Sequence, residues 1–350
     1  YLSTMRKIQE NLLEFLETSD DFSNAFGQFT IFLTEQHFQN ETLKEFLNLI
    51  SKISMNHHRT INFIKKIESI LIFLKSDILS KVSNLSLFNT FCDNKRILLF
   101  LFKNNFLTID DYIYNQLTSS DDFTEYFAPE LILYQTKKPI EDAIFEENRE
   151  KCENNSYLCE LIRNDSVKEF IILLNKNEFN VTTKIKSTCF ETSPFLLEKT
   201  SVSLIEYAVF FGSIQIFRYL YSNNVELNSS LWLFAIHSNN PEIIHFLEEN
   251  HVLPDDKSYQ YCLKESIKCY HNDIAHYIQD NLLKKSSQTE ALFEFYNFEF
   301  LFGDFKKKQS FNQLCRYNYL LLANIIIENV NINEAMNDVY LIIILYHTIV

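Results

Sequence analysis

The chain contains only three glycines, Gly27, Gly212 and Gly303, among its 350 residues. Glycine supplies the left-handed backbone of tight hairpin turns and lets a loop approach a phosphate group closely. Phosphate-binding loops and dinucleotide-binding motifs need several glycines in a short window, and the nucleophile elbow Gly-x-Ser-x-Gly needs two. None of these motifs is present. With only five prolines as well, the sequence predicts helices rather than many short strands.

Composition and charge narrow the class of protein further. Hydrophobic residues make up 46% of the chain, with 33 Phe and 18 Tyr, so it can bury large cores. The formal net charge of −14 repels phosphate backbones, and we therefore expect no nucleic-acid partner. Seven cysteines without Cys-x-x-Cys pairs, and no secretory leader, predict a cytoplasmic, non-secreted protein. The apolar run 339–350 is shorter than the roughly 20 residues of a membrane span, so no transmembrane segment is predicted.

The first third of the chain has the periodicity of amphipathic helices. From residue 4 to about 118, apolar residues recur at spacings of three and four, as in Ile8, Leu12 and Leu16. This pattern predicts about six short helices. A polar and acidic stretch follows, interrupted by apolar side chains, so we expect an N-terminal helical block over residues 1–125.

Internal repeats follow this block. Ala208, Gly212, Ile216 and Leu220 are matched 27 positions later by Ala235, Asn239, Ile243 and Leu247, and 31 positions after those by Ser266, Tyr270, Ile274 and Ile278. The pattern predicts a helix pair: a small residue on the first helix, a turn, and an apolar stripe on the second. Neither helix can bury its stripe alone, so stacked copies form a solenoid. Weaker copies begin near Ile97, Leu161 and Cys315.

The repeats resemble ankyrin repeats, which have a Thr-Pro-Leu-His-x-Ala start and an Ala-x-x-Gly-x-x-x-Ile-Val-x-x-Leu body. The segments 203–220 and 230–247 look like divergent versions, and Ser203 with Glu206 forms the pattern of a capping box. Ser230 is expected to cap the next copy. Tyr270 and Tyr319 occupy the expected glycine position. The whole chain, including the run His57-His58-Arg59-Thr60, resembles a large protist family that joins an N-terminal helical region with a domain of unknown function to ankyrin-like repeats.

These observations together predict an all-α protein, an ankyrin-like helix-pair solenoid preceded by an N-terminal helical block. After the block, we expect a transitional segment with a degenerate helix-pair repeat over residues 126–200 and divergent ankyrin repeats over 201–285. An insertion over 286–310 and a terminal repeat or cap over 311–350 complete the predicted organisation.

The resemblance implies a non-catalytic scaffold that binds a partner protein, because ankyrin arrays have no chemistry of their own. We expect the partner on the concave face, which the first helices and their preceding turns form. The candidate partner-binding residues surround the first helices: Glu206, Tyr207, Phe210, Phe211, His237, Ser238, Tyr270 and His271.

Two other functions stay open. One is an enzyme or ligand-binding protein with its site in the N-terminal helical block, which a deep pocket gathering two or more titratable side chains of residues 1–200 would favour. The other is an adaptor on a membrane or the cytoskeleton that makes contact through the apolar run 339–350.

No catalytic, cofactor or metal site is predicted. Cys262, Cys269, His271 and His276, with His245 nearby, lack the tight pair spacing of structural zinc sites. His57 to Thr60 follow a helix, where cationic groups complement the helix dipole, with contact to a partner as the alternative. For Trp232 the alternatives are core packing and an exposed anchor. The lysine run 306–308 is a solvated loop or a docking loop.

Overall fold

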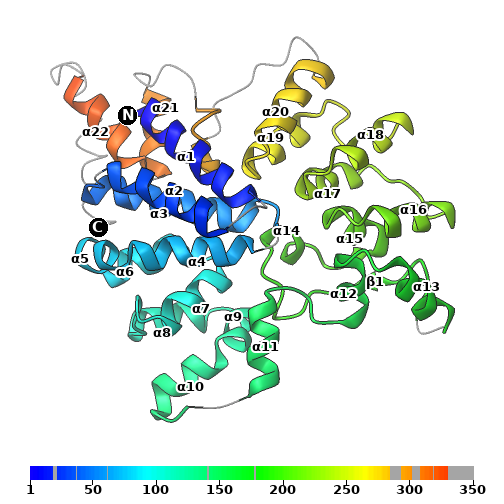
Figure 1. Ribbon diagram of the computed structural model, residues 1–350, viewed down its shortest axis with the longest axis horizontal. Helices are drawn as coiled ribbons and strands as arrows, with labels where there is room; N and C mark the ends of the chain where they lie inside the picture. Colours follow the sequence, from blue (N-terminus) through cyan, green and yellow to red (C-terminus); the bar gives the residue numbers. More distant parts are fainter. Residues whose placement is uncertain are drawn as a thin grey trace. The chain divides into compact units, whose positions relative to one another are not determined.

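The computed structural model describes residues 1–18, 22–36, 38–60, 62–139, 142–176, 179–283, 293–301, 308–317 and 319–329. Within these ranges the chain is predominantly helical, as the sequence predicts, with helices α1 to α22 and one short pair of strands (Figure 1). None of the helices in these ranges is both long and apolar enough to cross a membrane. The apolar run 339–350 lies outside the described residues, and so do residues 306 and 307 of the lysine run.

The chain divides into two compact units. Unit 1 comprises residues 1–52, 60–82 and 288–350, and unit 2 comprises residues 53–59 and 83–287. The units therefore divide the chain at places other than the expected boundary near residue 125. The segment 311–350, expected to end the repeat array, belongs to unit 1.

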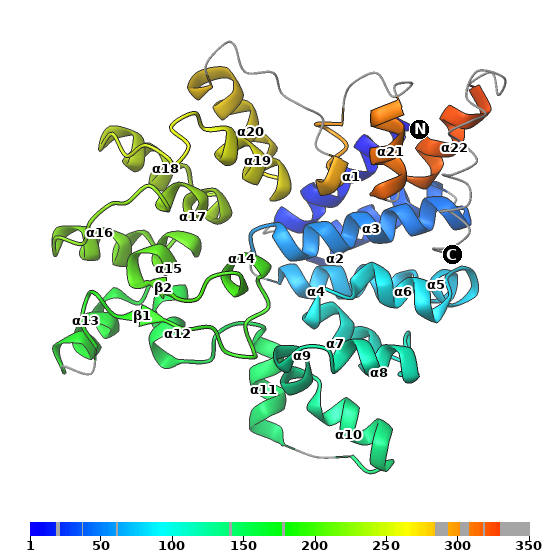
Figure 2. The same ribbon diagram turned by 180° about the vertical axis from the view of Figure 1, so that it is seen from behind.

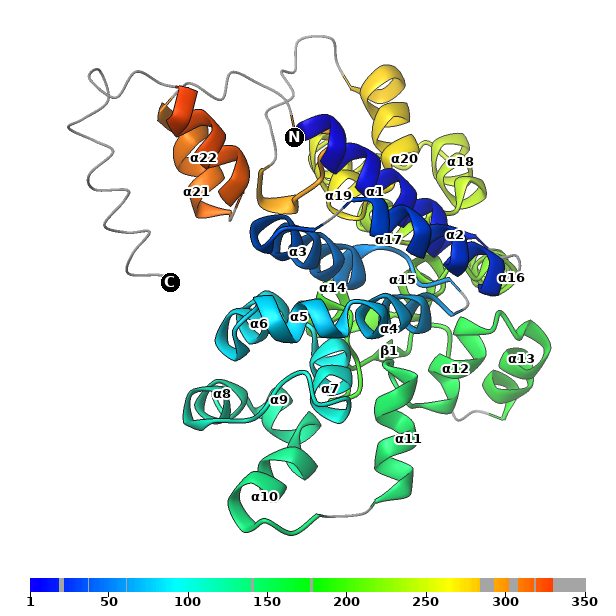
Figure 3. The ribbon, with the colours of Figure 1, turned by 60° about the vertical axis from the view of Figure 1, so that its left-hand side comes forward.

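Unit 1 brings the N-terminal helices together with the C-terminal segment. Its elements are α1 (Leu2–Glu17), α2 (Phe22–Glu35), most of α3 (Asn40–Asn56), α4 (Phe63–Phe73), α5 (Lys75–Lys81), the 3₁₀ turn η2 (Phe293–Phe295), α21 (Lys308–Arg316) and α22 (Leu320–Asn329). The buried Gln9 amide donates to Asn297 Oδ1 at 2.8 Å and accepts from the Phe298 amide at 2.8 Å. These hydrogen bonds connect α1 to the segment after η2. No local sequence pattern predicts them. Figure 3 shows α21 and α22 side by side at the end of the described chain.

Unit 2 contains the rest of the helices. They are α6 (Asn84–Phe91), α7 (Lys95–Lys103), α8 (Asp111–Leu117), α9 (Asp121–Tyr126), α10 (Ala128–Thr136), α11 (Ala143–Lys151), α12 (Tyr157–Arg163), α13 (Val167–Asn175), α14 (Pro194–Leu197), α15 (Leu204–Phe210), α16 (Ile214–Ser222), α17 (Leu231–Ser238), α18 (Pro241–Glu249), α19 (Gln260–Lys268) and α20 (Asn272–Tyr277) with a π-helical turn η1 (Ile278–Leu282). Strands β1 (Lys184–Ile185) and β2 (Val202–Ser203) pair antiparallel immediately before α15. Figure 2 shows these strands beside α15.

Helices α12 to α20 form successive pairs. The first helices contact one another in series, α12 with α15, α15 with α17, and α17 with α19 (Figure 1). The expected small residues Ala208, Ala235 and Ser266 lie on these first helices and have no exposed surface. Trp232 is also fully buried, and its indole N–H donates to the Val252 carbonyl, so the core-packing alternative is confirmed.

The same backbone geometry recurs at the turn inside each pair. Asp165, Gly212, Asn239 and Tyr270 all have left-handed φ angles, between 48° and 69°. The amides of Ser213 and His271 donate to the carbonyls five residues earlier, at 2.8 and 3.0 Å, a hydrogen bond that ends helices at a left-handed residue. Tyr270 thus adopts the glycine-like conformation that the alignment predicts, at a steric cost that glycine avoids.

Two of the sequence assignments are wrong. Ser230 begins α17, but its side chain does not cap the helix; it bonds instead to Glu206 Oε1 at 2.6 Å. Tyr319 does not occupy the glycine position, because its amide donates to the Leu314 carbonyl five residues earlier at 2.9 Å. It therefore corresponds to Ser213, one residue after Gly212.

Acidic side chains connect one helix pair to the next. The Asp165 carboxylate, in the turn between α12 and α13, accepts from the amides of Gln215 and Ile216 at 3.0 and 2.9 Å. It therefore satisfies two of the free amides at the start of α16. Glu206 completes the predicted capping box with Ser203 through one oxygen and accepts from Ser230 through the other. Each carboxylate thus stabilises the stacking of neighbouring pairs.

We predict that Asp165→Ala lowers the free energy of unfolding of unit 2 by about 1 kcal/mol more than Asn224→Ala does. Both residues have left-handed φ angles, so each substitution removes a similar preference for that backbone conformation. Only Asp165, however, caps α16. Urea unfolding followed by the fluorescence of Trp232, the only tryptophan, measures both losses. Equal losses would show that the carboxylate bonds contribute nothing.

In unit 1, a buried carboxyl lies where the two ends of the described chain meet. Glu45 has no exposed surface; it accepts hydrogen bonds from the Tyr1 hydroxyl and from the Leu321 amide. Burial raises the pKa of Glu45 from 4.5 to about 7, although both hydrogen bonds oppose the rise. The folded state therefore favours the protonated carboxyl below neutral pH.

Unit 1 should accordingly lose stability as the pH rises from about 4.5 through 7, because the unfolded chain releases this proton first. The full pKa difference corresponds to about 3 kcal/mol. Thermal unfolding at pH 5 and pH 8 checks this, with Glu45→Gln as the variant that removes the titration. If the variant keeps the same pH dependence as the unchanged protein, Glu45 is not its source.

Candidate functional site

Unit 2 contains a partly enclosed polar pocket of about 80 Å³. Five segments of the chain line it. They contribute Met55, Asn56, His57, His58 and Arg59 at the end of α3, Glu153 in one loop, Glu191 and Ser193 in another, Phe210 and Phe211 at the end of α15, and His237 and Ser238 at the end of α17. A cavity of this size and polarity has room for several water molecules or a small ion. Six of its side chains are ionisable, which marks it as the candidate site.

Two arginines, Arg59 and Arg163, share one glutamate, Glu153, at the pocket; Arg59 and Glu153 line it. Arg59 donates to the Cys152 carbonyl at 3.0 Å and to Thr192 Oγ1 at 2.7 Å, and lies 3.5 Å from Glu153. Arg163, on α12, pairs with the other oxygen of Glu153 at 2.8 Å. The side chains of Arg59, Arg163 and Glu153 are each less than a fifth exposed. Removal of one of these charges would therefore leave its partners partly buried and unbalanced.

A second glutamate is completely enclosed. Glu191 Oε1 accepts from the amides of Thr192 and Ser193, both at 2.9 Å. Burial and the negative charge of Glu153 raise the pKa of Glu191, and Arg59 opposes them. The backbone of this loop is held by the buried Lys95 of α7, whose ammonium donates to the carbonyls of Cys189 and Glu191 at 3.1 Å each.

His237 closes another side of the pocket. Its ring packs against Phe195 and Phe210, and its Nε2–H donates to Glu265 at 2.8 Å. Burial lowers the pKa of His237, although the hydrogen bond and the charge of Glu265 oppose this. Burial alone would raise the pKa of Glu265, but the hydrogen bonds and charges of His237 and Lys268 lower it to about 2. Glu265 is therefore a carboxylate that accepts from the buried His237. Cys269 Sγ lies 3.5 Å from His237 Nδ1.

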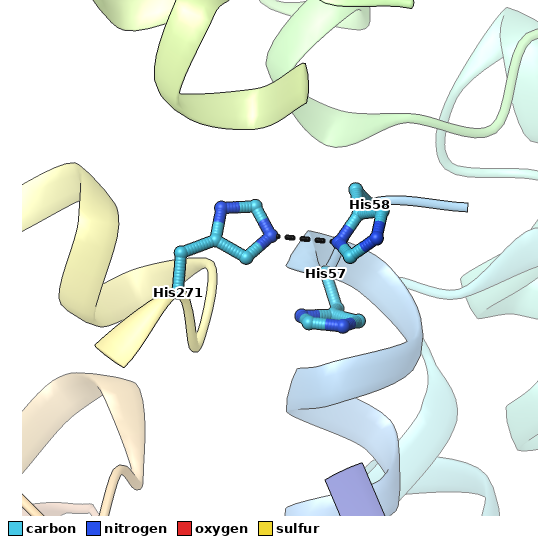
Figure 4. A group of neighbouring side chains, drawn as sticks. All are labelled: His57, His58 and His271. Atoms are coloured by element: carbon cyan, nitrogen blue, oxygen red, sulfur yellow. Dashed lines mark hydrogen bonds between the residues drawn. The ribbon is translucent and has the colours of Figure 1, made fainter. Parts of the chain in front are cut away.

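Three histidines gather beside the pocket. His57 and His58 follow α3, and His271 comes from the turn between α19 and α20 (Figure 4). His58 Nδ1 lies 3.0 Å from His271 Nε2, and one candidate nitrogen of each ring lies within 4.8 Å of the others. Burial lowers the pKa of His271 well below its usual value, and the neighbouring imidazoles of His57 and His58 lower it further. The His271 imidazole therefore disfavours protonation.

The eight predicted partner-binding residues fall into three places. Phe210, Phe211, His237 and Ser238 line the pocket. Glu206 links two helix pairs, as described above, and Tyr207 is buried with its hydroxyl accepting from Arg163 at 3.0 Å. Tyr270 and His271 are buried at the turn after α19. Tyr207, His237, Tyr270 and His271 therefore pack inside this chain rather than on an open face, because the first helices bury most of their circumference against each other.

The sequence reasoning missed the part played by the run His57-His58-Arg59. Its position after a helix is as predicted, but His57 is only 3% exposed, so it does not act as a surface cation at a helix end. No sequence pattern pointed to Glu153 and Glu191 as site residues, because both lie in irregular loops. The suspected zinc group does not gather in the described residues: His245 bonds to Glu248 at 3.1 Å, whereas His271 meets His57 and His58.

No family model, no curated protein and no solved structure matches this chain. The likeness to ankyrin repeats and to the protist family accordingly stays a prediction from the sequence. What the structure adds is the geometry of the pocket and of the helix pairs.

We predict that Glu153→Gln destabilises unit 2 by about 2–3 kcal/mol, because it leaves Arg59 and Arg163 without their shared countercharge. Urea unfolding read by Trp232 fluorescence is the measurement. The matched control is Glu147→Gln, which removes an exposed pair with Lys151 and should change the stability by less than about 0.5 kcal/mol. Similar effects of the two variants would contradict a structural role for the Arg59–Glu153–Arg163 network.

Proposed function

We propose that the chain is a non-catalytic scaffold that binds a partner protein on an ankyrin-like solenoid formed by α12 to α20. The observation that carries this proposal is the recurrence of one turn geometry, at Asp165, Gly212, Asn239 and Tyr270, inside successive helix pairs whose first helices contact one another in series. Arrays of this kind present extended surfaces to which each repeat contributes, and binding is their usual role.

The turns that precede the first helices offer such a surface. An open groove of about 810 Å³ lies between the turn before α17 and the turn before α19. Its walls include Tyr221, Val225, Glu226, His251 and Leu253. Tyr221 and Leu253 are 40% and 51% exposed, so two large apolar side chains face solvent at the groove. An apolar patch among polar neighbours is typical of a protein-binding surface.

We therefore place the partner on this groove and on the adjoining half-buried parts of the first helices. Among the eight candidates, Glu206, Phe210, Phe211 and Ser238 keep partial exposure.

The proposal predicts that Tyr221→Ser combined with Leu253→Ser weakens capture of the partner about tenfold or more, because it removes the apolar contacts. The measurement is affinity capture by the full chain from an extract of its native cells, with quantitative mass spectrometry. Ile31→Ser in unit 1 is the control, since it removes an apolar side chain that is 64% exposed but lies on α2.

Two results would contradict this function. One is that the double variant captures the same proteins in the same amounts as the unchanged chain. The other is that the control variant loses the partner while the double variant keeps it, which would place binding in unit 1.

A second candidate function has one specific observation in its favour. The polar pocket gathers His57, His58, Arg59, Glu153 and Glu191, more than the two titratable side chains of residues 1–200 expected above at a ligand-binding or catalytic site. A panel of small polar metabolites, tested by thermal unfolding, separates this function from the first. A ligand of the pocket should raise the unfolding temperature of the unchanged protein and not that of Glu191→Gln. If no compound in the panel does so, this function loses its support.

A further inference from the structure

We propose that His57, His58 and His271 together bind a divalent transition-metal ion of the zinc type. The inference is independent of partner binding, and it rests on the placement of three imidazoles from two distant segments around one point (Figure 4). His58 and His271 are 213 residues apart in the chain. Imidazole nitrogen is a preferred ligand of Zn²⁺, Cu²⁺, Ni²⁺ and Co²⁺.

The hydrogen bonds around two of the rings fix their tautomers. His57 Nδ1 lies 2.8 Å from the Cys269 carbonyl, and His271 Nδ1 lies 2.7 Å from the Ile236 carbonyl. A carbonyl oxygen only accepts, so Nδ1 carries the proton in both rings and Nε2 carries the lone pair. Metal-binding histidines in proteins are oriented in this way, by an N–H···O=C bond from the nitrogen opposite the metal.

The distances are close to those of a bound ion. Three nitrogens at about 2.0–2.1 Å from one tetrahedral zinc ion lie about 3.3 Å apart. The separation of His58 Nδ1 and His271 Nε2 is 3.0 Å, and all three candidate nitrogens are within 4.8 Å of one another. Ring movements of about 1.5 Å or less therefore close the site.

The proton balance of binding is simple. His58 Nδ1–H donates to His271 Nε2 in the metal-free arrangement, because His271 already uses its own proton at the Ile236 carbonyl. The ion replaces this hydrogen bond, and the His58 proton moves from Nδ1 to Nε2, so all three ligands stay neutral. Neutral imidazole is the form that binds metal.

The surroundings leave room for a further ligand. His57 and His58 also line the polar pocket with Arg59, Glu153 and Glu191. A tetrahedral ion with three histidines keeps one position for water or another small molecule. The ligand class is therefore a divalent ion with an exchangeable fourth ligand.

The neighbouring group His237, Glu265 and Cys269 is the alternative location for an ion. Its glutamate already accepts from His237 and from Lys268 at 3.2 Å. An ion there would also require Cys269 to lose its thiol proton, whereas neutral imidazole binds metal without losing a proton.

The test uses the full chain with reduced thiols, titrated with ZnCl₂ against a chromophoric chelator. We expect a single ion to bind, with an affinity that falls about tenfold or more in His58→Ala. His58 is only half-buried, so this variant should keep the fold, and circular dichroism checks that it does. His245→Ala is the control, because this exposed histidine on α18 lies outside the group; it should bind zinc as the unchanged chain does.

CoCl₂ supplies an independent readout through its visible and near-ultraviolet absorption. Ligation by three imidazoles should give the visible bands of a tetrahedral nitrogen site without a sulfur-to-metal charge-transfer band. Absence of zinc binding by the unchanged chain would overturn the proposal, and so would equal affinity in His58→Ala. A sulfur-to-cobalt band would also overturn it, since a cysteine would then bind the ion.

Discussion

The helices of unit 2 are too short to be stable alone, and this constraint governs the rest of its structure. The paired helices, α12, α13 and α15 to α20, have six to nine residues each, below the length at which isolated helices persist in water. Each must bury its apolar stripe against a neighbour. The first helices do so against one another, which is why Ala208, Ala235 and Ser266 are small and fully buried. Stability in such an arrangement is shared between adjacent pairs.

Short helices also have a large proportion of free backbone groups at their ends. The turn inside each pair has the same conformation, because a left-handed residue occupies it: Asp165, Gly212, Asn239 or Tyr270. Asp165 and Glu206 then accept hydrogen bonds from backbone and side-chain donors of the next pair. One carboxylate thus serves both helix capping and stacking. Because each of these hydrogen bonds joins two adjacent helix pairs, we expect its loss to destabilise those two pairs most.

The same packing creates the polar pocket. The ends of α15 and α17 present Phe210, Phe211 and His237 to one space, and irregular loops complete it with Glu153 and Glu191. Arg59 and Arg163 share Glu153 there, and this attraction offsets part of the desolvation cost of the buried charges. Beside it, carbonyl groups at the ends of the first helices orient His57 and His271. A helix end has unpaired carbonyls by construction, and here they select the imidazole tautomers.

Much of the local structure was predictable from the sequence. The scarcity of glycine and the three- and four-residue periodicity are sufficient for an all-helical chain, and the alignment of Ala208, Ala235 and Ser266 places the helix pairs and their turns. The capping box at Ser203 and Glu206 follows from spacing alone. These features depend on residues within one or two turns of each other, where backbone stereochemistry acts. The sequence also indicated a binding scaffold, which stays a proposal.

Only the tertiary structure decided which distant residues meet. Arg59 reaches the Cys152 carbonyl across 93 positions, and His58 reaches His271 across 213. Gln9 on α1 pairs with Asn297, so the segment expected to end the repeat array joins unit 1 instead. Local periodicity reveals which face of a helix is buried but not which partner covers it, because the choice of partner depends on the total packing of all faces. The pocket and the histidine group are consequences of that choice.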